Sequence, residues 1–559
     1  MNWKRLFLPR LDAPLPLWMV FPVIFAALYA THATLLRLPY YWDEAGYYIP
    51  AAWDFFRTGS LIPTTTLNNA HPPLPSIYLA LWWKASGFYP EVTREAVLVV
   101  ASLGLLAVWR LAMRVVGAPS VAFWTALLTG IYPVWFAQST LAQADIFAAA
   151  CSVWGMVYSL PERGRRSWLA MAWFAAAALC KETAIAIPLT LAAVSLWEGA
   201  RDKSARRERW RETAWLAGSM VPLAGWYAWH YAKTGSLLGN AAYVEYNAEA
   251  TLAPLRILAA FGHRVLHLAA NMNMFVPVMM ALAALLLAPR TDAEGAERAM
   301  VGAEALRRIF ALLLVNAALF SVLGGALLTR YLLPMYPLVL LLAVTTLYRR
   351  VPYWHALAAV AAGAFVVGLF VNPPYGIAPE DNLLYAHVIR MQQAGIAELG
   401  KLDPGAAVLT AWPASDELRR PELGYVKRRW EVCTIDDFSA AQMARANVDL
   451  GKCTAALVFS TKYDPPPLVN VWPFNRKMDE RYFGLHHDLP PEQIAQRLGG
   501  KVQWRSDEGG MWIAVIGLNR PIEAPQIKAI CPEIRSERRG GLVMAGPGPD
   551  RAAQARKSL

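Results

Sequence analysis

The stretch YYWDEAGYY at residues 40–48 places two adjacent carboxylates, Asp43 and Glu44, among five aromatic residues. It follows an apolar run, residues 17–36, of the length that crosses a bilayer, for which roughly 20 residues suffice. Tyr and Trp gather at the membrane interface because their rings are amphipathic. The sequence therefore predicts that the two acids emerge where the membrane ends and water begins.

The composition indicates an integral membrane protein. The chain has 559 residues, of which 56% are hydrophobic and 17% charged, and its mean hydropathy is +0.29. Such a chain is too apolar for an ordinary soluble protein. The net charge of +12 lies in short clusters between apolar runs, which is typical of cytoplasmic loops. We therefore predict membrane lipids and not nucleic acid as partners.

The basic clusters predict the topology. We assign them to the cytoplasm by the positive-inside rule, and the apolar runs between them then give about eleven membrane-spanning helices with the N-terminus inside as a retained anchor. An odd number of spans places everything after Asn372-Pro373-Pro374 outside, in the periplasm of a bacterial inner membrane. The predicted spans are 17–37, 94–116, 120–137, 143–160, 167–181, 183–198, 213–232, 257–288, 308–329, 332–348 and 353–372.

Unusual polar residues gather at the turns on the non-cytoplasmic face. The assignment of the basic clusters to the cytoplasm does not require these polar residues to share one face. Ionisable residues at membrane depth cost free energy and are often functional. A second conspicuous motif, Ala70-His71-Pro72-Pro73-Leu74, follows the first acids in the same loop, and its histidine can carry charge near neutral pH. The sequence thus predicts a site on this face, with the candidates Asp43, Glu44, His71, Asp145, Lys181, Glu182 and Arg330.

The composition changes at about Tyr375, where long apolar runs end. Runs at 406–411 and 455–459 are typical of buried strands, and helix-like segments lie at 383–399, 440–448 and 491–498. We predict a soluble α/β domain over 375–520, followed by a largely disordered tail, 521–559. If this domain lies outside the cytosol, a disulfide is expected, and Cys433 to Cys453 is the favoured pair. The aromatic segment 72–88 is predicted to lie along the membrane surface as an amphipathic helix.

The Asp-Glu pair after the first span, followed by His-Pro-Pro-Leu in the same loop, resembles the GT-C class of membrane glycosyltransferases. The most similar groups are the protein O-mannosyltransferases and the aminoarabinose transferases that modify lipid A. The resemblance implies a polytopic α-helical catalytic domain, 1–374, whose first outer loop is 38–93. It also implies a polyprenyl-phosphate sugar donor and transfer to a hydroxyl of a lipid, a protein or a cell-envelope glycan.

The resemblance also implies roles for individual residues. Asp43 matches the catalytic base, Glu44 its neighbour and Asp145 a second acid, and direct attack by the activated hydroxyl would invert the anomeric carbon. His71, Lys181 and Arg330 match positions near the donor phosphate, with Glu182 and Tyr331 in support. Arginine suits this task because its planar fork binds phosphate oxygens in pairs. Tyr47 and Tyr48 either stack on the sugar or anchor the helix at the interface.

Simpler interpretations of these residues remain open at this point. Asp43 can cap the helix that begins near Ala45, and Asp145 can cap the span that follows it. Lys181 and Glu182 can neutralise each other, and Arg330 can extend from the interface to water.

We predict no cofactor. Asp43, Glu44 and Asp145 could gather a divalent ion, but the ligand set is thin and we predict metal independence. Two other functions are the alternatives. A transporter or flippase of lipid-linked sugars should show paired, broken half-length segments, which the sequence lacks, and a non-catalytic envelope assembly factor would tolerate loss of Asp43.

Overall fold

The computed structural model describes residues 16–518 apart from 163, 241–250, 293–294, 403–406, 441–442, 444–452, 464, 466–472 and 484–486. The predicted tail and most of the helix-like segment 440–448 lie outside the described residues. The chain forms two compact units. The helical unit comprises Met1–Leu36, Asn69–Gly239 and Leu252–Val371, and the mixed unit comprises Arg37–Asn68, Asn240–Thr251 and Asn372–Leu559.

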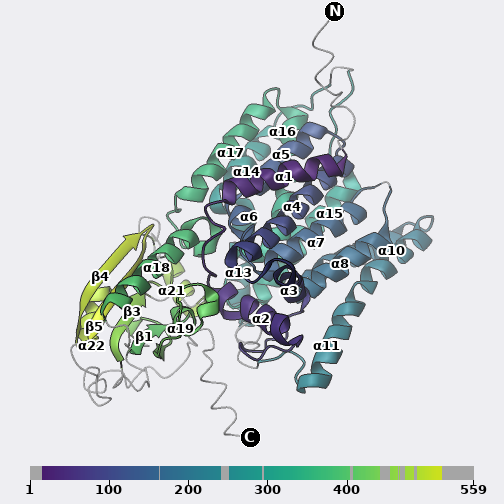
Figure 1. The fold of residues 1–559 in the computed structure, drawn as a ribbon. Helices are drawn as coiled ribbons and strands as arrows, with labels where there is room; N and C mark the ends of the chain where they lie inside the picture. Colours follow the sequence, from purple (N-terminus) through teal and green to yellow (C-terminus); the bar gives the residue numbers. More distant parts are fainter. Residues whose placement is uncertain are drawn as a thin grey trace, which may run out of the picture. The chain divides into compact units, whose positions relative to one another are not determined.

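The helical unit contains a helix, or a pair of helices, at every predicted span (Figure 1). Its first part consists of α1 (Leu17–His32), α3 (Leu74–Ser86), α4 (Pro90–Val115), α5 (Pro119–Ile131), α6 (Pro133–Gln138), α7 (Ala144–Ser159) and α8 (Ser167–Cys180). Its second part consists of η3 (Glu182–Ile185), α9 (Ala186–Arg201), α10 (Arg206–Gly218), α11 (Met220–Thr234), α13 (Pro254–Ala269), η5 (Asn271–Asn273), α14 (Phe275–Ala284), α15 (Ala303–Val322), η6 (Thr329–Met335), α16 (Tyr336–Arg350) and α17 (Trp354–Phe370).

Among the described residues, four helices are long and apolar enough to cross a membrane, and a fifth candidate is a bent pair. The bent pair joins 254–273 to α14 at an angle of 99°, so the predicted span 257–288 is not one straight helix. Met272 and Asn273 have positive φ at this break, a conformation that ends regular helix. Shorter apolar helices include α1, α7 and α17. The protein is thus a multi-pass helical membrane protein, whereas the total of eleven spans stays a prediction.

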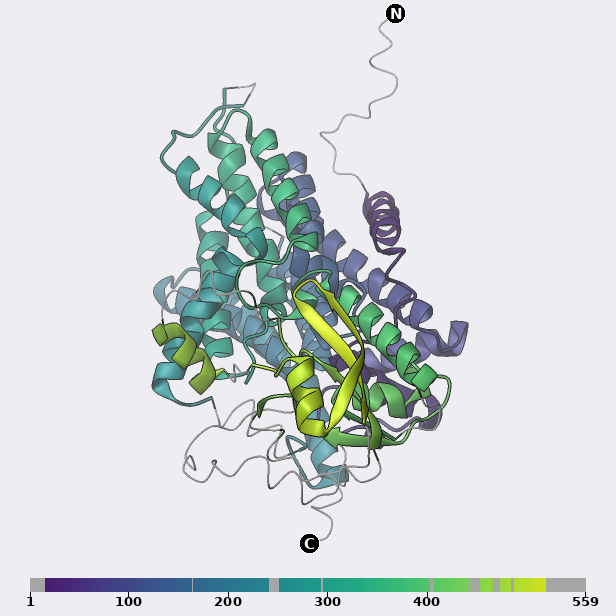
Figure 2. The same cartoon turned by 90° about the vertical axis from the view of Figure 1, so that its left-hand side faces the viewer.

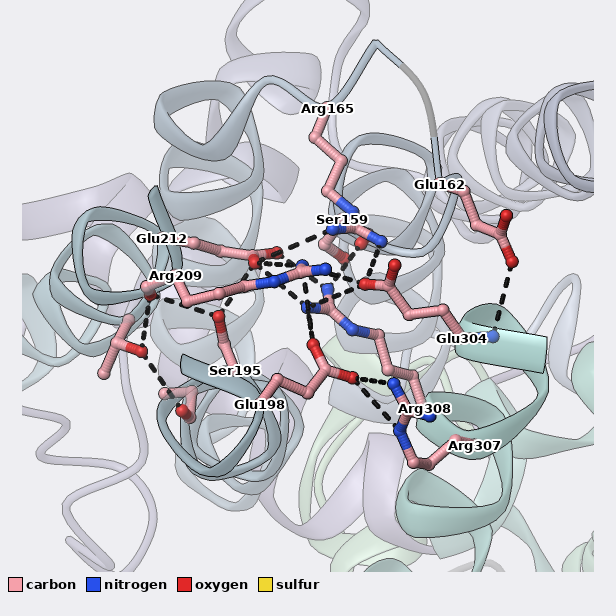
Figure 3. A network of polar contacts seen from close by, with 12 residues as sticks. Ser159, Glu162, Arg165, Ser195, Glu198, Arg209, Glu212, Glu304, Arg307 and Arg308 are labelled. Carbon is pink, nitrogen blue, oxygen red and sulfur yellow. Dashed lines mark hydrogen bonds and ion pairs between the residues drawn. The ribbon is translucent and has the colours of Figure 1, made fainter. Parts of the chain in front are cut away.

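A buried network of ion pairs joins three helices of the helical unit (Figure 3). Arg308 of α15 has no exposed side-chain surface. Its guanidinium donates to Glu212 of α10 at 2.7 and 3.0 Å and to Glu198 of α9 at 3.0 Å. Arg307, its neighbour, also pairs with Glu198 but is 44% exposed. The two arginines therefore offer a matched comparison of a buried and an exposed partner of the same carboxylate.

We expect Arg308→Met to destabilise the protein by about 3–5 kcal/mol, because it removes the fully buried cation that Glu198 and Glu212 share. Arg307→Met should cost about 1 kcal/mol or less, because the exposed pair is screened by solvent. Thermal or denaturant unfolding of the full chain in detergent measures both. Equal losses in the two variants would contradict the assigned role of Arg308.

The mixed unit contains a five-stranded sheet with the order β2-β1-β3-β5-β4. β1 is parallel to both β2 and β3, whereas β5 is antiparallel to β3 and β4. Figure 2 shows β4 and β5 in yellow as a long hairpin. The elements of this unit are η2 (Glu44–Tyr48), α2 (Ile49–Thr58), η7 (Pro379–Asp381), α18 (Leu384–Leu402), β1 (Ala407–Ala411), α19 (Ala414–Arg419), η8 (Pro421–Leu423), β2 (Val432–Ile435), β3 (Cys453–Phe459), α21 (Pro473–Tyr482), α22 (Pro491–Leu498), β4 (Gly500–Glu508) and β5 (Met511–Leu518).

The sheet confirms the predicted α/β character of the C-terminal region, including the strands at β1 and β3 and the helices α18 and α22. The β4–β5 hairpin was not predicted, although Gly509-Gly510 between two runs is a hairpin signal. Both glycines have positive φ, as a two-residue turn of this kind needs. Cys433 and Cys453 form the predicted disulfide, which links the two strands that flank β1.

Glu417 of α19 is fully buried, and among the described residues neither of its carboxylate oxygens has a hydrogen-bond partner. Burial raises the pKa of this carboxyl well above its ordinary value, and the charge of Asp416 raises it further. The folded state therefore holds a proton that the unfolded chain releases. The free energy of unfolding should fall as the pH rises from the unfolded pKa through the raised folded pKa.

We expect Glu417→Gln to raise the melting temperature at pH 8 and to leave it nearly unchanged at pH 4, because glutamine cannot ionise. Thermal unfolding of the full chain at both pH values measures this. Glu422→Gln, at a half-buried position close by, serves as the control and should show no such pH dependence. A lower melting temperature for Glu417→Gln at pH 8 would contradict the prediction.

Candidate functional site

Asp145 lies in the first turn of α7, just after the turn that joins α6 to α7. Its side chain is 3% exposed, and its carboxylate lies 2.6 Å from Lys181 Nζ and 3.4 Å from Arg330 Nε. The N-cap position of α7 is Gln143, which makes no side-chain cap hydrogen bond. The interpretation of Asp145 as a helix cap is therefore wrong, since its carboxylate is the counter-ion of two cations.

Lys181 and Glu182 do not form a self-neutralising pair. α8 ends at Cys180, Lys181 is extended, and a 3₁₀ turn begins at Glu182. This change of direction sends the two side chains to different partners. Lys181 contacts Asp145, and Glu182 Oε2 lies 3.1 Å from Nδ1 of His71. Residues predicted from separate loops are thus joined in pairs across the helical unit.

Arg330 is buried in the 3₁₀ turn η6, with 3% of its side chain exposed. Its Nη1 donates to Oε1 of Gln143 at 2.7 Å. An arginine held this way does not extend to water, so the interpretation of Arg330 as an interfacial anchor is wrong. Gln143 was not predicted. Its Nε2 is buried and has no hydrogen-bond partner among the described residues, which leaves a donor beside Arg330.

The ring of Tyr331 lies close to two cations. Lys181 Nζ is 4.2 Å from the centroid of its ring, and Arg264 Cζ is 5.6 Å from it. Cations are attracted to the face of an aromatic ring, more strongly where water is excluded. The preceding loop approaches the ring closely, since a Cβ on Gly324 would lie 2.9 Å from Tyr331. With φ +92, this position accepts only glycine without strain.

Two arginines of α13 hold the loop before Arg330, and sequence reasoning missed both. Arg256 donates to the carbonyls of Gly324 at 3.0 Å and Gly325 at 3.2 Å. Arg264 donates to the carbonyl of Leu328 at 2.7 Å and to that of Phe320 at 3.1 Å. An arginine inside an apolar run is a signal of function, and Arg264 within the predicted span 257–288 offered that signal.

Several cations gather in this cluster of described residues. Its cations are Lys181, Arg330, Arg264 and Arg256, and its carboxylates are Asp145 and Glu182. Buried charges are costly unless they are compensated, and a group of neighbouring cations can be compensated by an anion. Arginine and lysine side chains form short, strong hydrogen bonds to phosphate oxygens. The arrangement suits the binding of a phosphate group.

The predicted acids of the first loop belong to the mixed unit. Asp43 is half-buried at the N-cap of η2 but makes no side-chain cap hydrogen bond, so the capping interpretation is wrong. Glu44 is fully buried, and its Oε2 accepts the backbone N–H of Tyr41 at 2.9 Å. Tyr47 packs against Trp412 at 6.2 Å between ring centroids, whereas Tyr48 is half-buried. Glu44 therefore shapes the turn that presents Asp43.

Among the residues that the structure describes, no three His, Cys, Asp or Glu side chains gather as metal ligands would. The structure brings His71 to Glu182, Asp145 to Lys181 and Arg330, and Lys181 to Tyr331, within the helical unit. Asp43, Glu44, Tyr47 and Tyr48 lie together in the mixed unit. Metal independence stays a prediction.

Comparisons with known proteins agree with the predicted class. Residues 70–229 match the family described as dolichyl-phosphate-mannose-protein mannosyltransferase. The fold is similar to that of ArnT from Cupriavidus metallidurans bound to undecaprenyl phosphate, with a TM-score of 0.50 and 13% identity over 89% of this chain and 98% of that one. The apo structure of the same ArnT aligns over the same shares at 13% identity and a TM-score of 0.49. No curated protein matches the sequence.

The family match spans His71, Asp145, Lys181 and Glu182, and the fold match extends over most of the chain. Together they confirm the resemblance to GT-C membrane glycosyltransferases that the first two motifs predicted. They support a glycosyltransferase in general terms.

Proposed function

We propose that this chain, a membrane protein with the fold of GT-C glycosyltransferases, transfers a sugar from a polyprenyl-phosphate donor to a hydroxyl group. The acceptor is a lipid, a protein or a cell-envelope glycan on the outer face of a bacterial inner membrane. The N-terminus lies in the cytoplasm and the C-terminal domain in the periplasm. The ArnT structure that resembles this one is of a complex with undecaprenyl phosphate, which is a polyprenyl phosphate like the lipid part of the donor we propose, without its sugar.

The gathering of Lys181, Arg330 and Arg264 around Asp145 and Tyr331 carries this proposal. Lys181 and Arg330 both contact Asp145, and Lys181 and Arg264 both lie against the ring of Tyr331. A lipid phosphate would supply negative charge, at the depth where its polyprenyl tail stays in the bilayer. His71 and Glu182 complete the phosphate-binding group in this proposal.

The chemistry needs one base and one cationic pocket. Asp43 takes the proton of the acceptor hydroxyl, and the hydroxyl oxygen attacks the anomeric carbon. The new glycosidic bond forms as the bond from that carbon to the phosphate oxygen breaks. The phosphate leaves with the bonding electrons, and Lys181 and Arg330 stabilise its charge. Attack opposite the leaving group inverts the anomeric centre. In this scheme Asp145 positions the two cations and does not act as a second base.

The proposal is tested by supplying radiolabelled polyprenyl-phosphate sugars, pentoses and hexoses, to membranes that contain the protein. Transfer above the level of membranes without it is expected, and the fraction that gains label identifies the acceptor. The activity should persist in EDTA, because the protein side chains alone provide the base and the cations. Absence of transfer from every donor would contradict the proposed function.

A further inference from the structure

The segment 40–48, which carries Asp43, is anchored on the C-terminal part of the mixed unit. The backbone N–H of Tyr40 donates to the carbonyl of Leu423 at 3.3 Å, and the Tyr425 hydroxyl donates to the carbonyl of Tyr40 at 3.0 Å. Tyr41 packs on the fully buried Tyr385 at 5.9 Å between ring centroids. The anchors come from the far end of the chain, so the first loop is held by residues of the soluble domain.

Trp412 packs against the residues on both sides of Asp43. It directly follows β1, at the end of that strand. Its ring meets that of Trp42 edge to face at 5.1 Å. The ring of Trp412 also lies close to Gly46, where an added Cβ would be 2.6 Å from Cζ2 of Trp412. Asp43 therefore lies between two residues, Trp42 and Gly46, that both rest on one indole ring.

The backbone at this place is strained. Trp42 has φ +46, a left-handed conformation that a bulky residue rarely adopts and that costs about 1–3 kcal/mol. Such a conformation persists only where the surroundings enforce it, and strained residues cluster at functional sites. Glu44 holds the turn through the N–H of Tyr41, and Trp412 packs against the ring of Trp42. The strain sits at the residue immediately before Asp43.

We infer that the C-terminal domain is part of the catalytic machinery, and that Trp412 is a positioning residue that fixes the direction in which Asp43 faces its acceptor. The inference rests on the proposed function of Asp43 as the base. It gives the soluble domain a role that no motif within that domain indicates. It also explains why the first loop needs glycine at position 46, since any side chain there would push the segment away from Trp412.

The first test compares Trp412→Ala with Trp504→Ala, both at half-buried tryptophans of the mixed unit. A displacement of the base of about 1 Å costs on the order of 100-fold in rate, so kcat of Trp412→Ala should fall by about that factor while the KM for the polyprenyl-phosphate donor stays nearly constant. Trp504→Ala should retain kcat even where it lowers stability, and Trp412→Phe should restore part of the rate. Full kcat in Trp412→Ala would overturn the inference.

A second test uses the contact between Gly46 and Trp412. Gly46→Ala should lower kcat because its methyl group collides with the indole, and Trp412→Phe should relieve that collision by removing the outer ring. The double variant Gly46→Ala with Trp412→Phe should then be more active than the product of the single effects predicts. If the loss of kcat in the double variant equals the product of the losses in the two single variants, the contact between Gly46 and Trp412 is not the cause of the loss in Gly46→Ala.

Hydrogen–deuterium exchange separates failure of this inference from failure of the proposed function. Without any donor, Trp412→Ala should increase exchange in the peptide that covers residues 40–48, and Trp504→Ala should not, because local opening follows the loss of local packing. If Asp43→Asn is inactive while Trp412→Ala keeps both its exchange pattern and its kcat, the positioning role is wrong. If Asp43→Asn remains active, the proposed function of Asp43 is wrong, whatever Trp412 does.

Discussion

Replacement of Asp43 by asparagine should lower the rate of sugar transfer about 1,000-fold, within the range of roughly 10²–10⁴ that a general base contributes. Asparagine has nearly the same shape, so the turn at η2 and the proposed donor-binding residues of the helical unit should be unaffected. The acceptor hydroxyl, however, would keep its proton. The KM for the polyprenyl-phosphate donor should therefore stay close to that of the wild type while kcat falls.

The control for this variant is Asp507→Asn, at an exposed position of the mixed unit whose carboxylate pairs with Arg505. It removes a carboxylate of the same kind without touching the first loop, and it should keep the wild-type rate. Both rates are measured on purified protein at matched concentration. Transfer by Asp43→Asn within about tenfold of the wild type would remove this residue from the role of base.

Arg330→Lys should reduce kcat/KM for the donor by about 100-fold or more, although it preserves the charge. The guanidinium reaches Gln143 through Nη1 and Asp145 through Nε. Lysine cannot make both contacts and also present a second N–H to a phosphate oxygen, because its ammonium is a single point charge. The loss should appear as an increased KM and a reduced kcat, since the phosphate gains charge as it leaves.

Arg307→Lys is the matched control, because Arg307 pairs with Glu198 in the ion-pair network around Arg308. It should retain activity. Thermal unfolding distinguishes a chemical effect from a structural one, since a purely structural Arg330 would lower the melting temperature and the rate together. Wild-type kcat/KM in Arg330→Lys would contradict a role in phosphate binding.

Local sequence patterns predicted several of the buried charged residues of the helical unit. Asp145, Lys181 and Arg330 each interrupt an apolar run at a turn that is predicted to face outward, and such interruptions are visible without any structure. The sequence could not show which of these residues pair with each other. Lys181 contacts Asp145 and not its neighbour Glu182, because the 3₁₀ turn that begins at Glu182 points the two side chains in different directions. Arg264 carries the same signal within a predicted span, but its partners, the carbonyls of Phe320 and Leu328, could not be inferred from sequence.

Long-range packing was outside the reach of pattern reasoning. Nothing near Trp412 indicates that it contacts Gly46, and a contact between distant segments leaves no periodic signal. The sequence did not predict strand β4, because the strand contains several charged residues and no continuous apolar run. Alternate residues along this edge strand face water. The buried strands β1 and β3 were found because continuous apolar runs are typical of strands covered on both faces.

The most direct test of the central claim uses purified protein in liposomes with a donor labelled in both the sugar and the phosphate. If the protein is a glycosyltransferase, the two labels should separate. The sugar label should move to the acceptor, and the phosphate label should stay with the polyprenyl lipid. Loss of this separation in Asp43→Asn would assign the bond cleavage to this protein. If both labels remain on one lipid and only change leaflets, the protein is a transporter and the proposed transferase function is wrong.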